Sequence, residues 1–131
     1  MATNAGRFNT VSLTSDAALA QYRLVTLDPA VTTTDGSAAY PDAQGQHALG
    51  ITMTSADAAG KIVTVQYDGI ALAEAGGAIA AGDYITPFDG TTGKVGAATQ
   101  NDAKVGVALS AASADGEIIS VLLKPASDTH A

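Results

Sequence analysis

Two histidines, His47 and His130, are the side chains of this sequence whose ordinary pKa lies near neutral pH. Such a side chain could act as a general base or as a metal ligand. His47 precedes an expected strand, His130 lies in the C-terminal tail, and the sequence contains no cysteine. A metal site needs several ligands brought together. We therefore interpret His47 as a solvated loop residue and predict no metal site.

Other catalytic patterns are also missing from the sequence. No serine stands in a Gly-x-Ser-x-Gly motif, and many aspartates adjoin glycines, where their carboxylates cap turns. The acidic segment 35–42 lacks the spacing of a calcium loop, and the glycine-rich segment 76–82 is not followed by the Lys-Ser/Thr pair of a phosphate loop. We predict no catalytic residue, no cofactor and no enzymatic activity.

The composition argues against nucleic acid and membrane partners. The 131 residues carry a net charge of −7, and the six basic residues are scattered singly. Proteins that bind nucleic acids use clustered Lys and Arg to release counterions from phosphates. The chain has no run of about 20 apolar residues and no apolar stretch behind Arg7 that would make a signal peptide. We expect synthesis in the cytoplasm.

Short β-branched or alternating runs separated by Gly and Asp predict one all-β domain, a small antiparallel barrel or sandwich. The expected turns are Asp35-Gly36, Asp68-Gly69, Asp89-Gly90 and Asp115-Gly116, because glycine tolerates the positive φ of a tight turn. The expected strands are residues 10–13, 22–27, 48–54, 61–67, 69–72, 83–87, 94–97, 104–109 and 117–123.

Two segments are ambiguous. Ser15-Asp16 can cap a helical turn over residues 17–21. Residues 73–81 are rich in alanine, but Gly76-Gly77 would weaken a helix, so we interpret them as the end of a strand followed by a loop. We divide the chain into an N-terminal arm of residues 1–20, partly helical or disordered, a β domain of residues 21–124 and a flexible tail of residues 125–131.

An internal repeat is the most specific pattern. Residues 49–65 (LGITMTSADAAGKIVTV) align without a gap on residues 105–121 (VGVALSAASADGEIISV), 56 positions later. A weaker echo links residues 22–27 with residues 84–88. Each copy predicts a β-loop-β unit, and two such units suggest a pseudo-symmetric barrel or sandwich in which each half covers the other's apolar face. The identical pairs are Gly50/Gly106, Ala56/Ala112, Ala58/Ala114, Gly60/Gly116, Ile62/Ile118 and Val65/Val121.

The order of these motifs resembles the capsid cement proteins, or head decoration proteins, of tailed phages, from about Gln21 to Leu123. The residues that carry the resemblance are Gly50-Ile51, residues 63–65, 68–71, 80–85 and 105–108, Gly116 and residues 119–123. The resemblance implies an all-β, β-tulip-like fold and a non-enzymatic virion protein. It also implies attachment to the outer face of the major capsid protein shell, often as a homotrimer, and stabilisation of the head.

The N-terminal segment offers candidate contact residues. Residues 1–9 are polar except for Phe8 and cannot bury enough apolar area to fold alone. The segment is either disordered or an arm that orders on a neighbouring subunit by adding to a sheet edge, with Phe8 as an anchor. We take Arg7, Phe8, Asn9 and Thr10 as candidate contacts to the capsid or to another subunit.

Two other functions remain open. One is a non-catalytic β module that binds carbohydrate or a host surface, but sugar sites present aromatic platforms, and the chain has no Trp and few other aromatics. The other is an enzyme, such as a lyase or hydrolase fragment of a tail apparatus, which would have to depend on His47.

Overall fold

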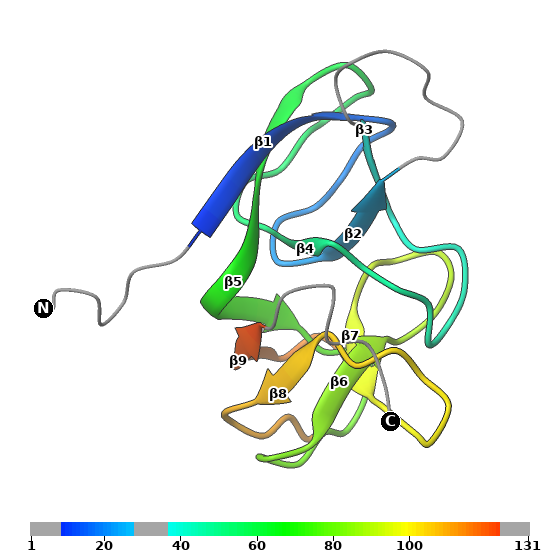
Figure 1. The fold of residues 1–131 in the computed structure, drawn as a ribbon, viewed down its shortest axis with the longest axis vertical. Helices are drawn as coiled ribbons and strands as arrows, with labels where there is room; N and C mark the ends of the chain where they lie inside the picture. The colour runs from blue at the N-terminus through cyan, green and yellow to red at the C-terminus, as the bar shows by residue number, and fades with distance from the viewer. Residues whose placement is uncertain (1–8, 28–36, 124–131) are drawn as a thin grey trace, which may run out of the picture.

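The computed structural model describes residues 9–27 and 37–123, and the regular secondary-structure elements in these ranges are all strands, joined by turns and loops (Figure 1). The all-β prediction is confirmed, and no helix of the described residues could cross a membrane. The strands are β1 (Asn9–Ser15), β2 (Leu24–Leu27), β3 (Ser37–Ala39), β4 (Gly50–Thr52), β5 (Ile62–Glu74), β6 (Tyr84–Pro87), β7 (Val95–Ala97), β8 (Gly106–Ala108) and β9 (Ile118–Leu123).

The first half of the chain closes into a small barrel. β1 pairs in parallel with β3, β3 pairs with β2, β2 with β4 and β4 with the first part of β5, the last three in antiparallel fashion. The ring closes because β5 also pairs with β1, with Leu13 opposite Val63 and Thr14 opposite Ile62. Closure removes the exposed edges that an open sheet of five short strands would leave.

The second half repeats this ring. The last part of β5 pairs with β9, with Glu74 opposite Ile118, and β9, β8, β6 and β7 follow in antiparallel order. A parallel bridge between Ala75 and Val95 brings β7 back to the end of β5. The 13-residue strand β5 therefore belongs to both barrels, which lie one above the other in Figure 1.

The internal repeat is confirmed and extends beyond the segments found in the sequence. The β4–β5 and β8–β9 hairpins superpose at an offset of 56, as the sequence predicted. The bridge Leu19↔Ala56 of the first half returns as Ile79↔Ala112 in the second, so the segment before β2 matches the segment before β6 at an offset of 60. The weaker echo was therefore misaligned: Leu24, not Tyr22, matches Tyr84.

Several local predictions were wrong. Asp68-Gly69 is not a turn between two strands but a bend within β5, where Gly69 has a φ of 95°. Residues 17–21 form no helical turn, because Leu19 bridges Ala56 instead. Strand β3 was not predicted, and Asp35-Gly36 lies outside the described residues. Gly116, with a φ of 94°, does form the expected turn of the last hairpin.

The division into arm and domain also needs a correction at its start. Residues 9–15 were assigned to the arm, but they form β1, which pairs with β5 from Asn9 to Thr14. Among the described residues, the sheet therefore already includes Asn9, twelve residues before the expected domain boundary at residue 21. Residues 1–8 and 124–131 lie outside the described part of the chain.

Each barrel has its own apolar core. In the first, Leu13, Leu19, Val25, Val63 and Val65 pack together with Ala38 and Ala56. The matching cluster in the second contains Ile79, Ile85, Ile119 and Val121 with several alanines. Leu24 and Ile51 belong to the second cluster although they lie on the first barrel, so the core of the second half extends onto the outside of the first barrel.

Candidate contact surface

The described residues do not bring catalytic groups together. His47 is exposed and lies in an open, mainly apolar hollow with Thr26, Leu27, Ala48 and Leu49. Within residues 9–27 and 37–123, no three His, Asp or Glu side chains are close enough to hold a metal ion. The deep polar pocket that an enzyme built on His47 would need is therefore not present at this position.

The charged side chains that do cluster join the two barrels. Arg23, before β2, donates to Glu74 at the end of β5 at 3.1 Å and to the carbonyl of Thr92 at 2.7 Å. Lys94 contacts Glu74 at 3.5 Å and Asp115 at 2.8 Å. The hydrogen bond from Lys94 to Asp115, together with the nearby charges of Asp115 and Glu74, raises the pKa of Lys94 against the opposing effects of desolvation and of the Arg23 charge. This network holds the halves in a fixed relative position.

A capped loop precedes Lys94. The carboxylate of Asp89 accepts hydrogen bonds from the backbone amides of Thr91 and Thr92, at 3.0 and 2.9 Å, and from the Thr92 hydroxyl. Burial alone would raise the pKa of Asp89, but these hydrogen bonds to its charged form lower it below the ordinary 3.8. The loop is thus stabilised by an ionised Asp89.

We expect this loop to contribute a pH-dependent part of the stability. The folded-state pKa of Asp89 lies below the unfolded value of about 3.8, so its contribution is complete above that pH and is lost as the pH falls through the lower, folded-state pKa. Denaturant unfolding should show wild type more stable than Asp89→Asn at neutral pH, with the difference shrinking below pH ~4. A difference that stays constant down to pH ~2 would contradict this assignment.

Several large apolar side chains are exposed together on the outside of the second barrel. Ile70, Leu122, Val107 and Tyr84 stand side by side across β5, β9, β8 and β6, as the pairings Ile70↔Leu122, Val107↔Leu122 and Tyr84↔Val107 show. Ile70 is 54% exposed and Tyr84 47%. We call this surface the apolar face; its large exposed members are Ile70, Leu72, Tyr84, Leu109, Ile118 and Leu122.

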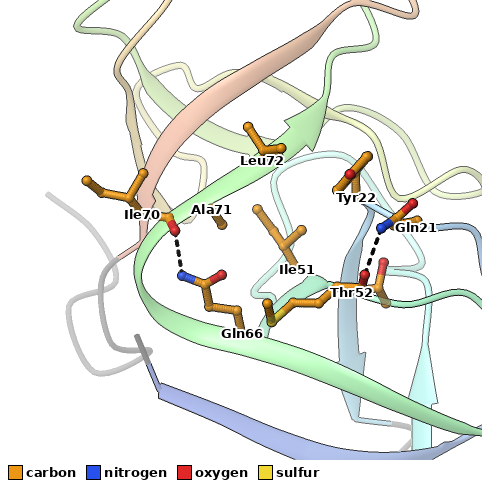
Figure 2. A pocket seen from close by; sticks show the side chains of 9 residues that line it. Gln21, Tyr22, Ile51, Thr52, Gln66, Ile70, Ala71 and Leu72 are labelled. Carbon is orange, nitrogen blue, oxygen red and sulfur yellow. Dashed lines mark hydrogen bonds between the residues drawn. The ribbon is translucent and has the colours of Figure 1, made fainter. Parts of the chain in front are cut away.

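A hollow of about 290 Å³ adjoins the apolar face where the barrels meet (Figure 2). Ile51 and Met53 of the first barrel and Ile70 and Leu72 of the second line it. Figure 2 shows the Gln66 amide reaching across the bend of β5 to the carbonyl of Ile70, a hydrogen bond of 2.8 Å. The hollow is apolar and open, which suits an inserted side chain better than a reacting substrate.

Two of the four predicted contact residues are described, and they lie beside this hollow. Thr10 pairs with Gln66, and Asn9 donates to the carboxylate of Asp68 at 3.2 Å. Both are exposed. Arg7 and Phe8 lie outside the described residues.

Sequence reasoning missed the apolar face. A signal for it was present, because residues 121–123 form an uninterrupted Val-Leu-Leu run in a strand whose side chains point alternately outward and inward. In an antiparallel sheet with one solvated face, such a run places large apolar side chains on both faces. The same holds for Ile70 and Leu72, which alternate with the buried Ala71 and Ala73.

The described residues thus form two joined barrels with an exposed apolar face on the second. The sequence matches the phage cement protein family over residues 4–124. The chain therefore belongs to this family and is a structural protein of the phage head, as the resemblance implied.

A solved structure supports the fold. The structure titled "The crystal structure of head fiber gp8.5 N base in bacteriophage phi29" is similar with a TM-score of 0.69 and 16% sequence identity. The match covers 89% of this chain and 94% of that one. Because the identity is low, this likeness concerns the fold alone. The search of curated proteins found no match.

Proposed function

We propose that this protein binds the outer surface of the major capsid protein shell of a tailed phage as a homotrimer and stabilises the head without catalysing a reaction. The observation that carries the proposal is the family match, which spans residues 4–124 and thus both barrels. The proposal adds three points to the family match: the outer surface of the shell, the trimer and the identity of the capsid partner. Arg7, Phe8, Asn9 and Thr10 are proposed contacts to the shell or to a neighbouring subunit.

The construction of the molecule supports such a role. Two closed barrels joined through β5 and through the Arg23–Glu74 pair form a rigid body that loses little freedom when it binds. A trimer multiplies any contact to the shell, because once one subunit is bound the others meet their sites at high effective concentration. Patches of about 800 Å² per partner then suffice for stable attachment.

The test is sedimentation of the purified full chain with empty capsid shells of its phage. We expect saturable binding to intact shells, and we expect the bound protein to be accessible to added protease, as an outer location requires. Protein that stays in the supernatant at every concentration would contradict the proposal. Specific hits in a glycan screen, without shell binding, would favour a carbohydrate-binding module instead.

A further inference from the structure

The two barrels differ in side-chain polarity on the outer surface of β5 and its partner strands. The pairings Thr10↔Gln66 in the first barrel and Ile70↔Leu122 in the second occupy the same place in the repeat, as do Ser12 and Leu72. The first barrel thus forms with Thr, Ser and Gln at positions where the second has Ile, Leu and Leu. Since the fold does not require large apolar side chains there, the apolar face needs another explanation.

The rest of the apolar face corresponds to positions of the first barrel that are covered within the chain. Leu24 and Ile51 pair across β2 and β4, as Tyr84 and Val107 pair across β6 and β8. Leu24 and Ile51 are 0% and 1% exposed because the second half of the chain packs on them, with the Leu24 amide donating to the carbonyl of Gly93. Among residues 9–27 and 37–123, no comparable unit packs on Tyr84, which is 47% exposed.

We infer that the apolar face is covered by a second copy of this chain. A unit of the same fold already covers the equivalent positions of the first barrel, so the molecule itself contains a precedent for the packing of one such unit on this kind of face. Six large apolar side chains expose an area of several hundred Å², approaching one side of a standard interface of about 800 Å². The inference rests on the self-association in the proposed function and names its surface.

The experiment exchanges the apolar residues for those of the first barrel. The triple variant Ile70→Thr, Leu72→Ser and Leu122→Gln introduces only side chains that the same fold already carries at the matching positions. A control variant, Leu27→Thr with Ile62→Thr, removes equally exposed apolar side chains from the first barrel; they are 48% and 65% exposed. Circular dichroism and thermal unfolding establish that both variants fold.

Sedimentation velocity of the purified proteins, without shells, gives the result. We expect oligomers for wild type and the control and a single 12.9 kDa chain for the triple variant. A monomeric wild type would overturn both the inference and the trimer while leaving shell binding to its own test. An oligomeric triple variant would overturn the inference alone. A triple variant that keeps its oligomer but loses shell binding would assign the face to the shell instead.

Discussion

Gly106→Ala should lower the free energy of unfolding by about 3 kcal/mol. A Cβ atom at Gly106 would overlap the carbonyl oxygen of Leu122 on β9 and would lie close to the Cα atom of Leu123. These are backbone atoms, so no flexible side chain can move aside to make room. Gly50 stands in the same place against the carbonyl oxygen of Gln66 on β5, so Gly50→Ala should cost a similar amount. Denaturant unfolding of each variant measures the loss.

The matched control for this prediction is Gly77→Ala. A Cβ there would meet Phe88 at 3.4 Å, an ordinary contact, and its φ is not in the left-handed region. We expect a change within about 0.5 kcal/mol. If Gly106→Ala were as stable as this control, β8 and β9 could not approach each other as closely as the structure describes.

Leu24→Ala is the second substitution with a large expected effect. Leu24 is fully buried on the first barrel but packs in the core cluster of the second, so its loss leaves a cavity between the halves. Truncation of a buried leucine costs roughly 2–5 kcal/mol. The halves share β5, and Leu24 of the first barrel packs in the core of the second. We therefore expect one cooperative unfolding transition at lower denaturant, with amide protection falling in both barrels.

The same strand provides the control. Leu27 lies three residues further along β2 and is 48% exposed, so Leu27→Ala should change the stability by no more than about 0.5 kcal/mol. Loss of amide protection confined to the first barrel in Leu24→Ala, with the second barrel unchanged, would mean that the halves unfold independently.

The sequence predicted those parts of the fold in which local pattern and pairing agree. The β4–β5 and β8–β9 hairpins were found through the repeat, and the glycines that anchored the alignment, Gly50 and Gly106, are the residues that let paired backbones approach. Gly116 at the last turn followed from its Asp-Gly pair. These features depend on neighbours within one hairpin.

Features that depend on distant pairing were not predicted. Strand β3 consists of Ser37, Ala38 and Ala39, which have little strand propensity, and it forms because β1 and β2 pair with it. Asp68-Gly69 has the composition of a turn, but two different partners, β1 and β9, hold β5 extended on either side of it. Tertiary contacts decided both cases.

The contact surface was the least predictable part. Leu24 and Tyr84 occupy matching positions, yet one is buried and the other exposed, because only the first has the other half of the chain packed on it. No local pattern carries that difference. Of the predicted contact residues, Asn9 and Thr10 lie beside the hollow, and their contact with the capsid or another subunit stays a prediction, as does that of Arg7 and Phe8.

Thermal rupture of capsid shells tests most directly whether this protein acts as a cement. Empty shells of its phage are heated with and without a saturating amount of the full chain, and the rupture temperature is read by calorimetry or by release of a fluorescent dye. We predict a higher rupture temperature for the decorated shells, because bound protein must detach before subunits separate. Shells that bind the protein but rupture at an unchanged temperature would contradict stabilisation of the head.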